Sequence, residues 1–274
     1  TMLHDSARVA EVFRQPSLQM VSFTITEKGY SLRNAKHELM PAVAADMANG
    51  PVDCKSFMAQ LTAMCIERFR ACGTPLALVS MDNCSHNGEK LQKAVMEIAS
   101  AWRENGSITA EEYAYLENDV AFPWSMIDKI TPRPNPSVEK QLLADGLEDI
   151  SPFETAKHTF TAAFVNAEKP QYLVIEDKFP NGRPPLEEAG VIITSRDVVN
   201  KVEKMKVCTC LNPLHTCLAV YGCILGYDSI AAEMRDENLV KFITRMSHEE
   251  GMPFVVNPGV IDPEQFLNEV LTVR

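Results

Sequence analysis

The sequence predicts an α/β fold that is followed by a mostly α-helical region. Residues 75–81 form a continuous apolar run of strand length, and a polar loop and an amphipathic helix come after them. This order is the repeating unit of parallel α/β sheets, whose strands are buried on both faces. From Ser195 onward, apolar side chains recur at helical spacing. We therefore expect one domain over residues 1–195 and a second over residues 196–274.

The amino-terminal region is expected to alternate strands with helices. Strands are expected where short β-branched or apolar runs end at turn residues: 21–26, 75–81 and 171–176. Helices are expected where apolar residues recur every three or four positions: 34–48, 55–72 and 89–102. Turn-forming residues predict loops at 27–30, 82–88 and 177–185. Residues 139–150 are acidic, and we expect them to be exposed.

The carboxyl-terminal region is expected to consist of helices. Their predicted ranges are 196–205, 214–227, 229–234, 237–250 and 263–273. In the second of these, Leu214, Leu218 and Leu225 recur at helical spacing and predict one buried face. Pro213 suits the first helical position, where no backbone donor is needed, with Asn212 before it as the N-cap.

The composition is that of a globular protein and argues against two classes of partner. The 274 residues are 46% apolar and 23% charged, with a formal net charge of −11. Since phosphate binding needs clustered Lys and Arg, we do not expect nucleic acid as a partner. The longest apolar run, residues 216–227, is too short for a bilayer, and no signal peptide is visible. We expect a cytoplasmic protein with no membrane partner, its eight cysteines reduced.

Polar side chains gather just before the apolar helix of residues 214–227. Lys206, Asn212 and His215 place an amine, an amide and an imidazole within a short stretch. Polar groups that converge at the start of a helix suit a catalytic or binding site. The alternative interpretation is an ordinary helix cap, a surface lysine and a hydrogen-bonded histidine.

The same stretch allows a metal-binding interpretation. The candidate zinc ligands are Cys208, Cys210, His215 and Cys217. Structural zinc sites usually use cysteine pairs separated by two to four residues, and this spacing does not match them. We therefore expect no metal site.

A second polar stretch follows the predicted buried strand. Residues 82–88 begin where the strand of residues 75–81 ends. Ligands of open parallel sheets bind outside the carboxyl ends of the strands, so this loop is a candidate binding site. Its alternative interpretation is a connector made of turn-forming residues.

Several stretches, taken in order, resemble one family. They are residues 21–30, 80–88, 122–132, 175–179 and 206–215. Together they are similar to the long-chain polyol dehydrogenases, which include mannitol 2-dehydrogenase and fructuronate reductase (mannonate oxidoreductase). The similarity covers nearly the whole chain. It implies a partial Rossmann-like NAD-binding domain followed by a mostly helical substrate domain.

The resemblance also implies roles for individual residues. The implied catalytic set is Lys206, Asn212, His215 and a loop asparagine, for which Asn87 is favoured over Asn83. The implied cofactor contacts are Thr26, Glu27, Asp82, Asn83 and Asp128. Glu203, three residues before the lysine, matches a glutamate that helps the lysine exchange its proton.

The implied activity is the NAD-dependent, metal-independent interconversion of a ketone and an alcohol. Lys206 would be the general acid and base, Asn212 and Asn87 would donate hydrogen bonds to the oxyanion, and His215 would hold a substrate hydroxyl. We expect a sugar acid pair, D-fructuronate and D-mannonate. The alternatives are fructose and mannitol, or a non-catalytic chain that binds a sugar acid or a partner.

The sequence departs from the family pattern in two respects. Five residues separate Lys206 from Asn212, where the family usually has four, and we expect a loop before Pro213 to absorb the extra one. No Gly-x-Gly-x-x-Gly occurs among the twelve glycines. Because that motif holds the cofactor phosphates in the first βαβ unit, we expect this unit to precede Thr1 and the chain to be truncated at both ends.

Overall fold

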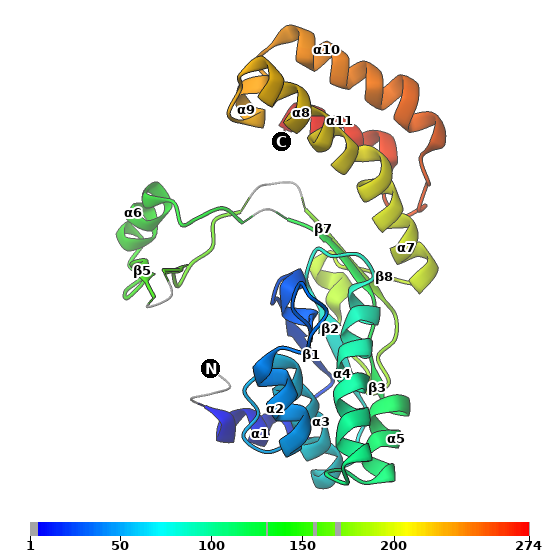
Figure 1. Ribbon diagram of the computed structural model, residues 1–274. Coiled ribbons are helices and arrows are strands. Elements are labelled where there is room, and N and C mark those ends of the chain that lie inside the picture. The colour runs from blue at the N-terminus through cyan, green and yellow to red at the C-terminus, as the bar shows by residue number, and fades with distance from the viewer. Residues whose placement is uncertain (1–4, 130, 156–157, 168–170, 274) are drawn as a thin grey trace. The chain divides into compact units, whose positions relative to one another are not determined.

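Figure 1 shows the computed structural model of the chain, which describes residues 5–129, 131–155, 158–167 and 171–273. Its contacts divide the chain into two units. The first unit joins Thr1–Met126 to Leu173–Arg274, and the second unit is Ile127–Tyr172. A domain boundary at residue 195 stays a prediction, because the first unit contains residues from both sides of it.

The predicted α/β class is confirmed by a parallel sheet in the first unit. Its strands are β1 (Met20–Phe23), β2 (Leu76–Ser80) and β3 (Val120–Ala121), in the order β1-β2-β3. Both pairings are parallel, with Phe23 opposite Ser80. Every residue of β2 is buried, as expected for a central parallel strand. The carboxyl ends of β1 and β2 therefore lie side by side.

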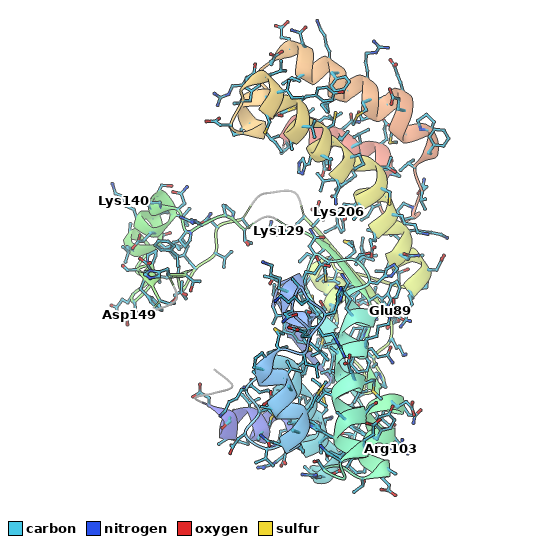
Figure 2. All side chains as sticks on the ribbon, in the orientation of Figure 1. Glu89, Arg103, Lys129, Lys140, Asp149 and Lys206 are labelled. Atoms are coloured by element: carbon cyan, nitrogen blue, oxygen red, sulfur yellow. The ribbon has the colours of Figure 1, made fainter. Side chains whose placement is uncertain are left out.

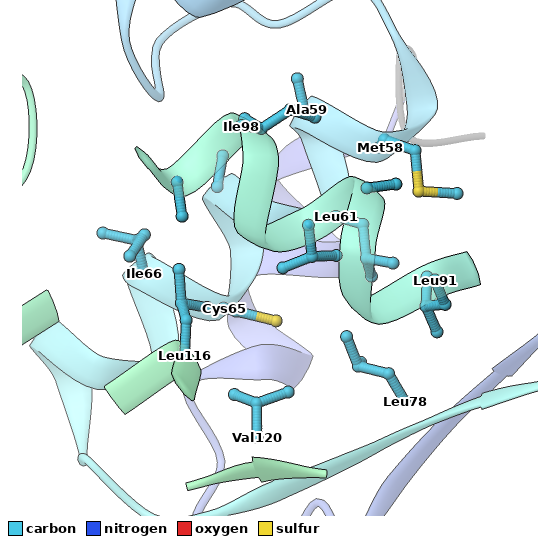
Figure 3. Packing of buried hydrophobic residues seen from close by; sticks show 14 of the residues in the cluster. Met58, Ala59, Leu61, Cys65, Ile66, Leu78, Leu91, Ile98, Leu116 and Val120 are labelled. Atoms are coloured by element: carbon cyan, nitrogen blue, oxygen red, sulfur yellow. The ribbon is translucent and has the colours of Figure 1, made fainter. Parts of the chain in front are cut away.

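Helices cover this sheet with their apolar faces. They are α1 (Ser6–Phe13), α2 (Pro41–Asn49), α3 (Phe57–Ala71), α4 (Asn87–Glu104) and α5 (Ala110–Asn118), with a 3₁₀ turn η1 at Glu27–Tyr30. Figure 3 shows Leu61 and Cys65 of α3 and Leu91 and Ile98 of α4 packed in one cluster with Leu78 of β2. The cluster fixes β2, and with it the position of the loop that follows.

A buried arginine joins α3 to the chain segments that precede β1 and β2. Arg68 is 0% exposed, and its guanidinium donates hydrogen bonds to several backbone carbonyl groups. The acceptors are the carbonyl oxygens of Phe13, Gln15, Leu18, Thr74 and Pro75, at 2.8 to 3.2 Å. Arginine suits this position because its planar group carries five N–H donors in a fixed arrangement.

One predicted helix begins later than expected. The helix predicted over residues 34–48 starts at Pro41. Before it, the side-chain oxygen of Asn34 accepts hydrogen bonds from the N–H groups of Lys36 (2.9 Å) and Glu38 (3.1 Å). This bonding holds a turn that competes with the helix.

A second sheet has the order β4-β7-β8. Its strands are β4 (Ser125–Asp128), β7 (Tyr172–Glu176) and β8 (Ile192–Thr194), and a 3₁₀ turn η2 (Leu186–Ala189) precedes β8. β7 and β8 are parallel, with Val174 opposite Ile192. The strand predicted over residues 171–176 is thus confirmed.

Among its described residues, the second unit contains the end of β4, a helix and a hairpin. Helix α6 (Pro136–Ala144) is capped by Asn135, whose side-chain oxygen accepts from the N–H of Ser137 at 2.9 Å. The hairpin pairs β5 (Phe153–Glu154) with β6 (Phe160–Thr161) in antiparallel register. No residue of α6 is buried, as predicted for this acidic stretch, whereas Ile150 is 4% exposed.

The rest of the first unit is helical, as predicted. Its helices are α7 (Arg196–Met205), α8 (Asn212–Leu225), α9 (Ile230–Glu233), α10 (Glu237–Arg245) and α11 (Pro263–Val273). A π turn η4 (Met246–Gly251) and a 3₁₀ turn η5 (Met252–Phe254) follow α10. α8 and α10 lie side by side, with the rings of Tyr221 and Phe242 at 5.2 Å (Figure 1).

The loop predicted between Lys206 and the apolar helix is not found. α7 continues into a π turn, η3 (Lys206–Cys210), in which the N–H of Leu211 donates to the carbonyl of Lys206 at 3.0 Å. Asn212 is then the first residue of α8 and not its N-cap. Pro213 accounts for the irregular turn, because it lacks an N–H and its ring crowds the carbonyl group four residues earlier.

Arg196–Leu225 is consequently a helical run of 30 residues, long and apolar enough to cross a membrane by length and composition alone. From the sequence, only the apolar run of residues 216–227 was considered, because the helix that begins at Arg196 was not predicted to continue through the π turn. Core helices of proteins that do not enter membranes pass the same test, so the run does not by itself indicate a membrane protein.

Candidate functional site

The loop after β2 lies along one face of α7 and η3. Arg196, Asn200, Glu203 and Lys206 are spaced four, three and three residues apart, which places them on one helical face. From Asn200 onward, each of these side chains is hydrogen-bonded to the loop of residues 82–88. The two polar stretches that the sequence singled out are therefore brought together.

Lys206 is the first residue of η3 (Figure 2). It is buried beside the loop, with 1% of its surface exposed. Its Nζ donates to the side-chain oxygen of Asn83 at 3.2 Å. A buried amine needs such acceptors, because burying an unpaired ammonium is costly. Asn83 itself is exposed, so its amide nitrogen can donate to a molecule that binds beside the lysine.

Glu203 lies one helical turn before Lys206 and is held by the loop. It is 7% exposed. The hydroxyl of Ser85 donates to its Oε1, and the backbone N–H of His86 donates to its Oε2 at 3.1 Å. These donors offset the cost of burying a carboxylate and fix its position on the same helical face as the lysine.

The side chain of Asn87 is hydrogen-bonded within the fold, and its predicted catalytic role stays a prediction. This residue is 0% exposed, and its Nδ2 donates to the carbonyl of Asp82 at 3.1 Å and to the hydroxyl of Ser125 at 2.9 Å. Its Oδ1 accepts from the N–H groups of Gly88 at 2.7 Å and Ser125 at 3.0 Å. Both amide N–H groups are therefore bonded inside the protein, and a substrate oxygen would have to replace one of these acceptors. Asn83 is the better candidate for a donor from this loop.

Gly88 lies where α4 comes closest to the chain before β4. A Cβ atom at this position would lie 2.6 Å from the carbonyl oxygen of Phe122 and 2.8 Å from that of Pro123. Because both are backbone atoms, they cannot move aside without shifting the strand. We expect Gly88→Ala to lower the free energy of unfolding by about 3 kcal/mol, measured by urea denaturation.

Gly251 offers a matched control for that substitution. A Cβ atom there would meet its nearest neighbour at 3.5 Å, which is an ordinary van der Waals contact. Gly251→Ala should leave the urea midpoint nearly unchanged. Equal midpoints for the two variants would contradict the packing argument.

Asp82 supports the chain that follows β1, and its predicted role as a direct cofactor contact stays a prediction. It is 5% exposed. Its carboxylate accepts from the N–H groups of Ile25 and Thr26, with the shortest distance 2.7 Å, and from the hydroxyl of Tyr30 at 2.5 Å. Burial, together with the bond to Asp82, raises the pKa of Tyr30. The carboxylate therefore points into the protein and holds the backbone of Ile25 and Thr26 in place.

Thr26 and Glu27 lie on the exposed side of this segment, where cofactor contacts were predicted. Thr26 has φ 63° and ψ 161°, a backbone region that residues other than glycine rarely adopt. Its bond to Asp82 holds it there. Glu27 forms an ion pair with Lys90 of α4. Strained backbone of this kind is common at ligand sites, so both residues remain candidates.

Asn212, His215 and Asp128 complete the predicted set. Asn212 and His215 are exposed on α8. His215 also borders an apolar cavity of about 20 Å³, which has room for no more than about one water molecule. Asp128 ends β4, is 3% exposed and belongs to the second unit. The roles of these residues stay predictions.

Three cavities among the described residues, of about 390, 430 and 520 Å³, are not lined by Lys206. One of about 390 Å³ is lined by residues of α1 and α3 and by the chain before α3. Another of about 430 Å³ is lined by Tyr30, Arg33 and Lys90, among others. The candidate site is therefore defined by its contacts and buried charges, and not by cavity volume.

Metal binding finds no support among the described residues. Within them, no group of three or more His, Cys, Asp or Glu side chains could hold a metal ion. In the stretch considered for zinc, Cys208 is exposed whereas Cys210 is buried, and both are free thiols. The two thiols thus lie in different environments.

The family model described as "Mannitol dehydrogenase Rossmann domain" matches residues 2–188 of the chain. The chain belongs to the mannitol dehydrogenase family. Its relatives in the family include D-mannonate oxidoreductase of Thermotoga maritima, 51% identical over 98% of this chain and 50% of the relative. Mannitol 2-dehydrogenase of Phaeosphaeria nodorum is 31% identical over 93% of this chain and 42% of the relative. The chain spans about half the length of the curated relatives it matches.

Solved structures of the family share the fold. D-sorbitol dehydrogenase in its substrate-free form superposes with a TM-score of 0.81, at 27% identity, over 99% of this chain and 52% of that one. The Pseudomonas fluorescens mannitol 2-dehydrogenase ternary complex with NAD and D-mannitol has a TM-score of 0.74, at 27% identity, over 98% and 51%. The predicted Rossmann-like class is thereby confirmed.

Sequence reasoning missed Ser85, His86 and Asn200, which join the loop to α7. A signal for Asn200 was available, because it shares the helical spacing of Arg196 and Glu203. No local signal marked Ser85 or His86, since their contacts depend on where the loop meets a helix more than a hundred residues later.

Proposed function

We propose that the protein of which this chain forms the matched part interconverts a sugar-acid ketone and its alcohol, D-fructuronate and D-mannonate, with NAD as cofactor. The 51% identity to a D-mannonate oxidoreductase supports this substrate class. The observation that carries the chemistry is the buried Lys206, bonded to Asn83 in the loop after β2. Loops of this kind, at the carboxyl ends of parallel strands, are where α/β enzymes bind their ligands.

The cofactor would lie along the carboxyl ends of β1 and β2. The adjacent ends of these strands, Phe23 and Ser80, fit this position, and Thr26 and Glu27 would contact the bound molecule from the exposed side. When bound, the nicotinamide supplies or accepts the hydride. The chain's own residues must then supply the proton and stabilise the charge on the substrate oxygen.

Lys206 would give a proton to the oxygen of the ketone as that oxygen gains negative charge. In the reverse direction the neutral amine would take the proton from the alcohol. The amide nitrogen of Asn83 would donate a hydrogen bond to the same oxygen. Glu203, fixed on the same helical face, would pass protons between Lys206 and the surroundings. Asn212 would add a second donor, and His215 would hold a substrate hydroxyl.

A second candidate activity is the mannitol 2-dehydrogenase reaction, which interconverts fructose and mannitol. Its support is the 31% identical fungal relative and the structural likeness to the mannitol-bound bacterial enzyme. A sugar acid also carries a carboxylate, which arginine or lysine binds best. The two activities therefore differ in whether the bound substrate is negatively charged. For either, we propose a cytoplasmic protein with no nucleic acid or membrane partner.

The test is NADH oxidation, followed by absorbance, with fructuronate and fructose in separate reactions. Oxidation with fructuronate alone is the expected result, and oxidation with fructose alone would favour the mannitol assignment. The chain as given and a chain of the relatives' full length that contains it are assayed together. Failure of the longer chain with both substrates would contradict the proposed function and favour a non-catalytic protein.

A further inference from the structure

His86 is the centre of the contacts between the loop and α7, and the proposed reaction does not use it. Its backbone is left-handed, with φ 49° and ψ 45°, a conformation that is unfavourable for residues other than glycine. In this conformation its N–H reaches Oε2 of Glu203 at 3.1 Å, and its ring nitrogen Nε2 lies 3.2 Å from the side-chain oxygen of Asn200. One residue thus binds two successive turns of α7.

The ring of His86 also stacks on Trp124, with a centroid distance of 4.2 Å and an interplanar angle of 26°. The guanidinium of Arg196 lies over the same indole, 5.0 Å from its centroid. Arg196 further pairs with Glu176 at 3.0 Å, and Glu176 accepts the backbone N–H of Trp124 at 3.0 Å. The first turn of α7 is therefore held by the same cluster as the next two turns.

These contacts fix the rotation of α7 about its axis. Successive residues of an α-helix are about 100° apart, so a shift of register by one residue would turn the whole face away from the loop. Arg196, Asn200 and Glu203 would then lose their partners together. Lys206 lies at the end of the same face, so its position beside Asn83 depends on the register set by the three turns before it.

We propose that His86 is a positioning residue that locks the register of α7 and thereby holds Glu203 and Lys206 against the loop. The inference about position stands on contacts within the first unit. Its consequence for catalysis rests on the proposed function of Lys206. The two parts are measured by different experiments.

The first experiment measures how well Lys206 is protected from chemical modification. His86→Gly removes the ring while allowing the left-handed backbone without strain. Acetylation by acetic anhydride under native conditions, followed by peptide mass spectrometry, gives the modification rate of Lys206. We expect the rate to rise at least about tenfold in this variant, because Lys206 is 1% exposed in the intact protein.

His37→Gly is the matched control. His37 is also a histidine in the left-handed region, with φ 62°, and it lies on an exposed turn between β1 and α2. This substitution relieves the same backbone strain without touching α7. It should change the acetylation rate of Lys206 by less than twofold. An unchanged rate in His86→Gly, or an equal rise in the two variants, would overturn the proposal.

Hydrogen exchange of the β2 amides separates local loosening from unfolding. They should stay protected in His86→Gly, because β2 is the buried central strand. Should they lose protection, Asn200→Ala is the second test, because it removes one partner of the His86 ring, the hydrogen-bond acceptor on α7, and leaves the stack on Trp124 in place. We expect a several-fold rise in Lys206 acetylation in Asn200→Ala, and no rise would refute the proposal.

The consequence for catalysis is measured in the chain of the relatives' full length that is used for the NADH assay. His86→Gly should lower kcat by about ten- to hundredfold with KM within about threefold, as expected when a proton donor is displaced by about 1 Å. If His86 had only a structural role, the substitution would lower the fraction of active protein, measured by active-site titration. The kcat of each active site would then stay unchanged. If the unsubstituted protein has no activity, the proposed function fails. The acetylation experiment still tests whether His86 holds the register of α7.

Discussion

Replacing Lys206 with alanine is expected to lower kcat for NADH-dependent ketone reduction by about 10² to 10⁴-fold in the full-length protein. The loss follows because the developing alkoxide would have no positioned proton donor. Affinity for NADH should stay within about threefold, since the proposed cofactor contacts lie on the segment after β1. Steady-state kinetics and fluorescence titration of NADH measure the two quantities separately.

Two controls make this prediction specific. Lys204→Ala removes an exposed lysine from the same helix and should leave kcat unchanged. Small primary amines added to Lys206→Ala should restore part of the lost rate, because they can occupy the space of the missing amine and donate a proton. Full activity in Lys206→Ala would exclude the acid and base role.

Replacing Arg68 is expected to cause the largest loss of stability among single substitutions of side chains in this fold. Arg68→Leu removes the guanidinium donors from four backbone carbonyl oxygens. Those of Gln15 and Leu18 keep a second donor, whereas those of Phe13 and Pro75 do not keep one from this group. Each unsatisfied buried group costs about 1–3 kcal/mol, so we expect a total loss of about 4 kcal/mol or more. That is a large share of the 5–15 kcal/mol typical of whole domains, and the variant should be largely unfolded at 37 °C.

Lysine does not replace this arginine. Arg68→Lys keeps the charge but has three donors on a single nitrogen, which cannot reach all the acceptors spread around the edge of the guanidinium plane. We expect a loss of about 2 kcal/mol or more in urea unfolding followed by circular dichroism. Arg14→Ala, which breaks an exposed pair with Glu67, should cost less than about 1 kcal/mol. If Arg68→Lys has the same urea midpoint as the wild type, the fixed arrangement of guanidinium donors does not contribute to stability.

Much of the fold followed from local patterns in the sequence. The buried strand β2 was visible because a central parallel strand is apolar at every position, and α7 and α11 were found with their observed bounds. The helix predicted from residue 34 failed because a side-chain-bonded turn at Asn34 competed with it. The continuation of α7 into α8 was missed because a proline is read as a helix boundary, although the chain passes it through a π turn.

The candidate site was predictable in composition and less so in geometry. The polar patterns of the sequence singled out the loop after β2 and Lys206, the resemblance gave them roles, and the structure brings them together. The resemblance could not show which asparagine faces the lysine. Asn87 was favoured by position, yet all its bonding capacity is used inside the fold, and this depends on Ser125 in a distant segment. Such saturation is a property of tertiary packing and leaves no local pattern.

The π turn at η3 has a consequence for how this helix can change over evolution. A π turn closes its hydrogen bond across one more residue than an α-helical turn, so it can accommodate one inserted residue where it stands. An insertion spread through a regular helix would instead rotate every later side chain by about 100°. Lineages can therefore gain or lose one residue between Lys206 and Asn212 while Leu214 and Leu218 keep their buried positions. The segment acts as a spacer of adjustable length between the lysine and the helix that follows.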